Sequence, residues 1–295
     1  MTAVSRDADA ALSHFEVEHL TDPSAIRRML ERERAYAAYA LAQLDPTLFP
    51  RNEWVLSSCE GAQALLVHSR SGLGNALFAI GDPGALNAAL SLHPGARFSF
   101  GSLRLEHRPV AERYYVLTRP QLMQRMAIEA TDFEHAPGAA VRLTEADVPQ
   151  VNALYSLEGG QTAYTGAHME EGLYHGVFEG GELVSIAGTH VVSRAEGVAV
   201  VGNVFTHPRH RSRGLATLAT SAVTRELLGF CNLVALTVEA ANEPAVRIYT
   251  RLGYKAVCNL HETPLIRKEP LGALSFVRRT IAGWRGRHEG KEVVG

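Results

Sequence analysis

The strongest hydrophobic pattern in the chain is a pair of apolar runs at residues 198–206 and 232–240. The first has the composition of a β-strand, and the second, rich in Leu, Val and Thr, predicts a buried strand. Between them, residues 215–228 predict a helix. This order of strand, helix and strand is typical of an α/β fold.

The pattern around this segment predicts further elements. Residues 144–157 predict a helix, because Thr144 can cap it and Asp147 follows three residues later. A glycine pair at 180–181 separates two strand-like runs and indicates a hairpin. The other predicted elements are an opening strand at 140–143, hairpin strands at 173–179 and 182–192, and a last helix after Pro244.

The N-terminal half also alternates between strand-like and helical patterns, which predicts a second α/β domain. Residues 22–43 predict a helix with Asp22 as its cap and Pro23 in its first turn. The segment 68–74, HSRSGLG, is assigned to a surface loop because no long helix follows it. The remaining predictions are strands near 53–57, 64–67, 77–80, 98–100 and 114–117, and a helix near 83–92.

A stretch containing Pro and Gly at 131–139 is typical of a linker. We therefore expect an N-terminal α/β domain at 1–135, a second domain at 140–265 and a C-terminal extension at 266–295. The extension mixes arginines with apolar residues and predicts an amphipathic helix. Packing against the same protein or a dimer mate is favoured over membrane binding, because the overall charge gives no support to a membrane partner.

Composition narrows the functional classes. The 295 residues are 46% hydrophobic and 20% charged, with a formal net charge of −2, which points to neither nucleic acid nor an anionic membrane as partner. The polar N-terminus is unlike a secretory signal, and no apolar run approaches the ~18–20 residues of a membrane-spanning helix. Cys59, Cys231 and Cys258 show no paired spacing, which suits a reducing cytoplasm and argues against a disulfide framework or a zinc site.

The turn before the helix at 215–228 carries the most specific chemistry. Arg211, Gly214 and Ala216 follow the spacing Arg-x-x-Gly-x-Ala. Backbone N–H groups at a helix start have no intrahelical partner, and the helix dipole adds partial positive charge there. Gly214 and Ala216 keep side chains out of the way, so a pyrophosphate can approach the backbone. The turn therefore predicts a diphosphate site.

On these residues the chain resembles the GCN5-related N-acetyltransferase (GNAT) superfamily, in which this turn holds the pyrophosphate of acetyl-coenzyme A. Asn242, Ala245, Tyr249 and the pair Gly253-Tyr254 match further family positions. The resemblance implies an α/β (α+β) fold with a mixed, mostly antiparallel sheet, splayed fourth and fifth strands and flanking helices. The N-terminal domain is interpreted as a degenerate GNAT copy, similar to the layout of glycine N-acyltransferase-like proteins.

The resemblance also implies which residues hold the coenzyme. A backbone N–H near Val204 would polarise the acyl carbonyl. Gly202 and Asn203 interrupt the strand and suggest a bulge that opens a slot for the thioester, although Gly202 could merely relieve crowding. Asn242 would bind the coenzyme arm or cap the last helix. The full implied set is Val204, Phe205, Thr206, Arg211, Ser212, Arg213, Gly214, Leu215, Ala216, Thr217 and Asn242.

Tyr249 is the predicted general acid, because a phenol with a pKa near 10 can protonate a thiolate whose conjugate acid has a pKa of about 8.5–9. The alternative is that its ring only packs beneath the coenzyme. No acid lies between 198 and 206, so the base must come from elsewhere. Glu239 is the first choice; the other candidates are His190, Glu170, Glu171 or a relay of waters.

These predictions converge on an acyl-CoA-dependent N-acyltransferase, with acetyl-CoA as the favoured cosubstrate and no metal. The acceptor would be the amine of a small molecule or amino acid, bound near the Gly-rich segment 158–172. Direct attack in a ternary complex is expected, because no Cys or Ser is placed for a covalent intermediate. The protein would be cytoplasmic, with a homodimer as the candidate assembly. The alternatives are a catalytically weak coenzyme A-binding sensor and a protein N-acetyltransferase.

Overall fold

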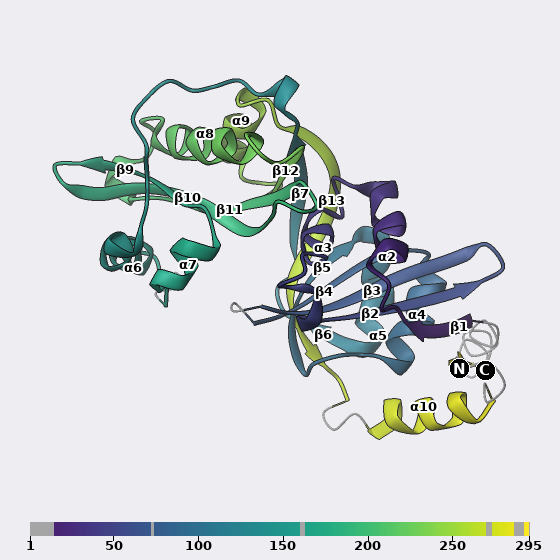
Figure 1. Cartoon of the computed structure of the whole chain (residues 1–295). Helices are drawn as coiled ribbons and strands as arrows, with labels where there is room; N and C mark the ends of the chain where they lie inside the picture. Colours follow the sequence, from purple (N-terminus) through teal and green to yellow (C-terminus); the bar gives the residue numbers. More distant parts are fainter. Residues whose placement is uncertain (1–14, 72–73, 160–162, 270–272, 286–291, 295) are drawn as a thin grey trace. The chain divides into compact units, whose positions relative to one another are not determined.

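The computed structural model describes residues 15–71, 74–159, 163–269, 273–285 and 292–294 (Figure 1). The chain divides into two compact units, neither of which is continuous in sequence. Unit 1 contains Met1–Glu33, Pro46–Met123 and Asn259–Gly295, and unit 2 contains Arg34–Asp45 and Gln124–Cys258. These units do not coincide with the linear division at 1–135, 140–265 and 266–295.

Unit 2 is built on a mixed sheet. Its strands lie in the order β7 (Gln121–Ile128), β12 (Leu233–Glu239), β11 (Val198–Thr206), β10 (Glu182–Ser193), β9 (His175–Glu179) and β8 (Val141–Arg142). The β11–β12 pair is parallel, whereas β10 is antiparallel to β11 and to β9. The helices are α3 (Ala38–Ala42), α6 (Val148–Ser156), α7 (Gly166–Glu171), α8 (Leu215–Leu228) and α9 (Glu243–Arg251).

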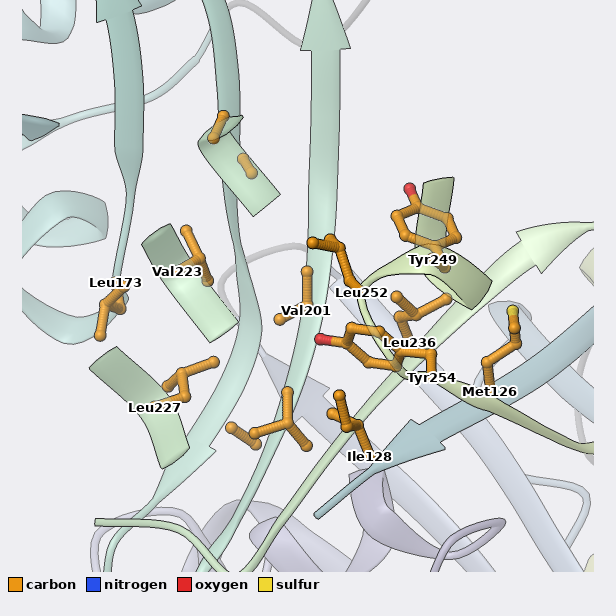
Figure 2. Packing of buried hydrophobic residues seen from close by; sticks show 14 of the residues in the cluster. Met126, Ile128, Leu173, Val201, Val223, Leu227, Leu236, Tyr249, Leu252 and Tyr254 are labelled. Carbon is orange, nitrogen blue, oxygen red and sulfur yellow. The ribbon is translucent and has the colours of Figure 1, made fainter. Parts of the chain in front are cut away.

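Helices cover both faces of this sheet (Figure 1). On one face, α8 and α9 contribute Val223 and Tyr249 to a core that also contains Val201 and Leu236 from the sheet (Figure 2). On the other face, α6 and α7 pack in a second cluster that includes Tyr155. The two clusters explain why most residues of β10 and the first four residues of β11 are buried, since strands covered on both faces have no solvent side.

Local sequence accounts for several element boundaries in unit 2. Thr144 and Asp147 form the predicted capping box before α6, which satisfies backbone donors at the helix start. Gly180 and Gly181 both have positive φ, at 59° and 86°, as a tight hairpin turn between β9 and β10 requires.

Unit 1 carries its own sheet. The strand order is β14 (Glu292–Val294), β1 (Phe15–His19), β2 (Asn52–Cys59), β3 (Ala62–Ser71), β4 (Gly74–Gly81), β5 (Phe98–Arg104) and β13 (Lys255–Arg267), and β6 (Tyr115–Leu117) also pairs with β13. Its helices are α2 (Pro23–Leu30), α4 (Pro83–Leu92), α5 (Arg108–Tyr114) and α10 (Ala273–Arg285). The β4–β5 pair is parallel and is joined by the buried α4, so unit 1 contains the same strand–helix–parallel-strand arrangement as β11–α8–β12 in unit 2.

The predicted fold class is confirmed, and most predicted strands and helices fall where expected. The helix expected at 22–43 is wrong in length, although Asp22 caps its start as predicted. It breaks after Leu30 because the following residues leave unit 1: Arg34 donates to the Glu196 carbonyl oxygen at 2.9 Å, and α3 packs against β10 and β11.

The surface loop expected at 68–74 is also wrong for most of its length. Residues 68–71 end β3 and Gly74 begins β4, with Ser71 opposite Gly74 in the antiparallel register. Most of the expected loop therefore belongs to two antiparallel strands, and residues 72–73 lie outside the described residues.

The tail forms the predicted helix, α10. Ala282 is buried, whereas Phe276 and Val277 are exposed. The side chains of Leu274, Ile281 and Trp284 lie outside the described residues, as does Leu271. Among the helices in the described part of the chain, none combines the length and apolar character needed to cross a membrane.

Gly253, between α9 and β13, is a position where the fold requires glycine. Its φ is +98°, and a Cβ there would lie 1.9 Å from the Asp132 carbonyl oxygen. We expect Gly253→Ala to lower the free energy of unfolding by about 3 kcal/mol or more, because strain and a steric clash combine. Gly180→Ala is the control, since Gly180 has φ +59° but no described heavy atom within 4 Å of the added Cβ. It should cost only about 1–2 kcal/mol. Urea unfolding of both variants measures the difference, and equal losses would contradict the clash.

Candidate active site

A cavity of about 760 Å³ lies in unit 2, within the size range of small-molecule sites. It is bounded by the later residues of β11 and β12 and by the starts of α8 and α9. Its lining contains eleven of the thirteen residues predicted to be catalytic or to bind the coenzyme: Val204, Phe205, Thr206, Arg211, Ser212, Gly214, Leu215, Ala216, Glu239, Asn242 and Tyr249.

The cavity opens where two parallel strands stop sharing hydrogen bonds. Strands β11 and β12 pair from Val198 opposite Leu233 to Val201 opposite Leu236. Beyond this point, residues 202–206 of β11 and 237–239 of β12 line the cavity instead. This is the splay that the sequence predicted for the fourth and fifth strands.

The predicted bulge at Gly202 and Asn203 is confirmed. Between two paired positions, β11 advances from Gly202 to Phe205 while β10 advances only from Gly188 to Ile186, so β11 carries one extra residue. Asn203 adopts the left-handed region with φ 54°. Such an extra residue bends the strand and changes the direction in which its side chains and backbone groups point.

Two tyrosines hold the bulged residue. The Tyr155 hydroxyl donates to the Asn203 carbonyl oxygen, and the Asn203 amide donates to the Tyr174 hydroxyl at 3.4 Å. Burial raises the pKa of both phenols, so both hydroxyls stay protonated. The sequence analysis did not identify these tyrosines, because their role depends on contacts between distant residues.

The start of α8 is open to a ligand. Gly214 has φ 77°, and no described side chain caps the helix. Ser212 also lies in the left-handed region, with φ 62°. Backbone N–H groups in such a turn can converge on one point and form a concave anion site, and the helix dipole adds to their positive potential.

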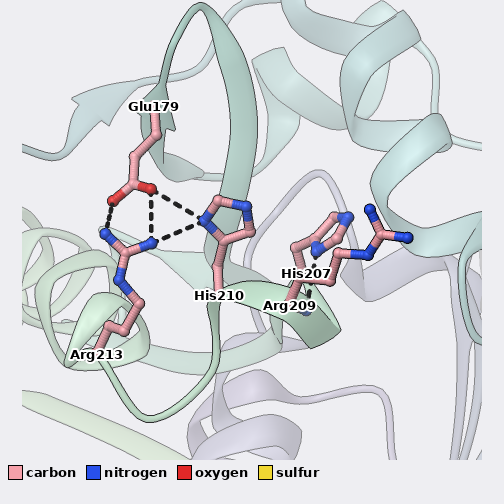
Figure 3. Close-up of polar contacts among 5 residues, drawn as sticks. All are labelled: Glu179, His207, Arg209, His210 and Arg213. Atoms are coloured by element: carbon pink, nitrogen blue, oxygen red, sulfur yellow. Dashed lines mark hydrogen bonds and ion pairs between the residues drawn. The ribbon is translucent and has the colours of Figure 1, made fainter.

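The two arginines of the turn have different surroundings. Arg211 lines the cavity, and its Nη2 lies 2.6 Å from the Glu158 carboxylate while its Nε donates to the Thr206 carbonyl oxygen at 3.2 Å. Arg213 instead forms a bidentate pair with Glu179, both distances being 2.8 Å (Figure 3). Within the described part of the chain, Arg213 and Thr217 are the two predicted coenzyme residues outside the cavity lining.

Tyr249 projects from α9 and is 8% exposed. Burial raises its pKa to about 12, so the phenol is protonated at neutral pH and can donate. Its ring lies edge-on to Tyr254 at 6.0 Å (Figure 2). The hydroxyl of Tyr254 bonds to that of Thr224 at 2.7 Å. Asn242 accepts from the Ala245 N–H at 3.2 Å, so it caps α9 as well as lining the cavity.

Two of the candidate bases also line the cavity, Glu239 at the end of β12 and His190 on β10. His190 is the extra residue of a second bulge, between Thr189 and Val191. It lies so close to β11 that a Cβ on Gly202 would be 2.0 Å from its Nε2, so Gly202 does relieve crowding, as the alternative interpretation held. His190 is exposed, yet desolvation by neighbouring protein atoms, and secondly the charge of Arg125, lower its pKa.

The acidic pair expected in the acceptor loop lies elsewhere. Glu170 and Glu171 are exposed on α7 and are absent from the described lining of the cavity. Residues 160–162 of the same predicted loop lie outside the described residues.

Residues 142–254 match the model of the acetyltransferase (GNAT) family. This segment is a GNAT domain. It contains the turn, both bulged strands and Tyr249. A search of curated proteins finds no match.

Solved structures show the same fold over more than the GNAT domain. A Drosophila protein is 15% identical with a TM-score of 0.61, covering 86% of this chain and 99% of that one. A GCN5-related N-acetyltransferase from Kribbella flavida is 20% identical with a TM-score of 0.54, covering 79% and 96%. A tandem GNAT protein from the clavulanic acid biosynthesis pathway is 15% identical with a TM-score of 0.50, covering 87% and 99%.

Proposed function

We propose that this protein is an acyl-CoA-dependent N-acyltransferase, with acetyl-CoA as the favoured acyl donor. The observation that carries the proposal is that no described side chain caps the start of α8. This helix start lies at a cavity that is also lined by Tyr249 and by the splayed ends of β11 and β12. One region can therefore bind a pyrophosphate and hold a thioester beside a proton donor. Family membership of residues 142–254 supports acyl transfer in general.

The residues at the cavity fit a coenzyme A molecule. The backbone N–H groups after Gly214 would donate to its pyrophosphate, and Arg211 would add a positive charge. Residues 204–206 would pair with the pantetheine arm through their main chain. Bound acyl-CoA supplies the activated acyl group as a thioester, and a backbone N–H near Val204 would polarise the carbonyl.

Tyr249 would then protonate the departing thiolate. A buried phenol with a raised pKa is a weak acid, but it is fully protonated at neutral pH, so its O–H can donate to the negative charge that develops on sulfur. The hydroxyl of Tyr254 bonds to Thr224, so we assign the proton to Tyr249.

We assign the role of proton acceptor to His190 and not to the predicted Glu239, because of the position of His190. Its lowered pKa keeps the imidazole neutral at physiological pH, so a lone pair is available to an incoming ammonium group. Both residues are exposed, but the contact of His190 with Gly202 places it at the start of the splay, whereas Glu239 lies at the end of β12.

The acceptor is proposed to be the amine of a small molecule or amino acid. Neutral His190 and buried Tyr249 provide the two proton transfers that direct attack requires, so no covalent enzyme intermediate is needed. A protein N-terminus or lysine would use the same groups, and a coenzyme A-binding sensor would keep the phosphate site alone. These alternatives make different predictions for turnover.

The first test is thiol release from acetyl-CoA by the wild type and Tyr249→Phe, with pooled amino acids, polyamines, aminoglycosides and peptides as acceptors. We expect acceptor-dependent release by the wild type and a kcat about 10²-fold lower for Tyr249→Phe, because general acid catalysis is lost. Tyr254→Phe is the matched control and should keep its kcat. Tight coenzyme binding with no release from any pool would instead favour the sensor, and release with peptides alone would favour a protein acetyltransferase.

The choice of base is tested with His190→Asn and Glu239→Gln. If His190 accepts the proton, its replacement should lower kcat by about 10²-fold, with little change in the Kd of coenzyme A. Glu239→Gln should retain most activity. The reverse order of effects would assign the role to Glu239, and full activity of both variants would favour a relay of waters.

The phosphate site is tested by placing a carboxylate at the open helix start. Gly214→Asp should raise the Kd of coenzyme A roughly tenfold relative to Gly214→Asn, about 1.4 kcal/mol, because the two side chains have similar shape and differ in charge. Isothermal titration calorimetry measures both values. Equal affinities would show that the pyrophosphate binds away from α8.

A further inference from the structure

Three side chains with metal-ligating atoms converge in unit 1, outside the proposed active site. His19 ends β1, Glu53 lies near the start of β2, and His93 directly follows α4. One ligand atom from each lies within 4.8 Å of the other two. Because these residues are 34 and 40 positions apart, no local sequence spacing reveals the cluster.

The distances fit coordination of one ion with little movement. The Nδ1 atoms of His93 and His19 lie 3.4 Å and 3.8 Å from the same Glu53 oxygen. Two ligand atoms that each lie about 2.0–2.1 Å from a tetrahedral zinc ion are separated by about 3.3–3.4 Å. The Glu53–His93 pair therefore already has the required spacing. The His19 side chain is 51% exposed and has room to close the remaining gap.

The surrounding structure fixes the more buried half of the cluster. The His93 side chain is 6% exposed, and the Nε2 of buried His68 donates to its backbone carbonyl oxygen at 2.9 Å. His68 is also the cross-strand neighbour of Glu53 in the β2–β3 register. Such supporting contacts orient ligands and raise metal affinity.

Glu53 and His93 lie on the wall of a second cavity, of about 1110 Å³, which is lined within unit 1. An ion held by three protein ligands at a cavity wall keeps a coordination position for water or a substrate atom. The cavity is also lined by Arg70 and Arg267, whose positive charges suit an anionic ligand beside the ion.

We propose that His19, Glu53 and His93 bind a first-row transition-metal dication of the Zn²⁺ class. Two imidazole nitrogens and one carboxylate oxygen favour such an ion over Mg²⁺ or Ca²⁺, which prefer oxygen ligands. The ion would join β1, β2 and the end of α4. The sequence analysis predicted no metal anywhere in the chain, because the three cysteines show no zinc-site spacing. The proposed site departs from that prediction, since its ligands are histidine and glutamate from distant positions.

Calorimetric titration of ZnCl₂ into the untagged full chain, after removal of metal with a chelator, tests the proposal. We expect one strong site per chain in the wild type. Glu53→Gln and His19→Asn should weaken it by at least about 100-fold, because each removes a ligand. His261→Asn is the control, since this histidine of the same unit faces Arg108 at 3.4 Å and not a carboxylate. It should leave the affinity unchanged.

A thermal melt of each variant separates lost binding from lost folding. Saturating Zn²⁺ should raise the Tm of the wild type and of His261→Asn but not that of Glu53→Gln or His19→Asn, while all four melts remain cooperative. Absence of strong binding by the wild type would overturn the proposal and leave a His–Glu–His cluster that binds no metal. Equal affinity in Glu53→Gln would also overturn it. Neither readout depends on acyl transfer.

Discussion

The separation of β11 from β12 beyond the Val201–Leu236 pair is the constraint on which the site depends. Separating two strands leaves backbone groups without ladder partners, at a cost of about 1 kcal/mol for each hydrogen bond. The left-handed backbone of Asn203 adds roughly 1–3 kcal/mol. Contacts from Tyr155 and Tyr174 hold this arrangement in place. The exposed edge of β11 is what an extended ligand arm could use as its pairing partner.

The two units contain the same strand–helix–strand arrangement, but they begin the helix differently. In unit 1, Asp82 caps α4 by accepting from the Ala85 N–H at 2.9 Å. A carboxylate therefore occupies the position where an anion would otherwise meet the helix dipole. In unit 2, Gly214 has no side chain that could cap α8, and no described side chain takes this role. The backbone N–H groups at the start of α8 therefore remain available to an anion. This difference of one side chain explains, within the proposed function, why only the GNAT domain would hold a pyrophosphate.

Short-range sequence patterns predicted the helices and strands and most residues that line the cavity. A capping residue such as Thr144 and a left-handed glycine such as Gly214 can be identified from their neighbours in sequence. What these patterns could not predict depends on distant contacts. The break after Leu30 follows from the attachment of the next residues to a different unit. The position of His190 depends on a bulge in β10, and bulges shift side chains without changing composition. Arg213 matched the coenzyme turn, yet Glu179 from the neighbouring hairpin draws it away from the cavity.

The carboxylate that faces Arg211 gives the phosphate site a second property. Glu158 follows α6 at the start of the predicted acceptor segment, and its pair with Arg211 is about half exposed on both sides. An exposed pair of this kind contributes only about 0–1 kcal/mol. A pyrophosphate carries more charge than one carboxylate and also receives the N–H groups of α8, so it would displace Glu158 at little cost. Within the proposed function, coenzyme binding would therefore release Glu158, the residue that begins the predicted acceptor segment, from Arg211.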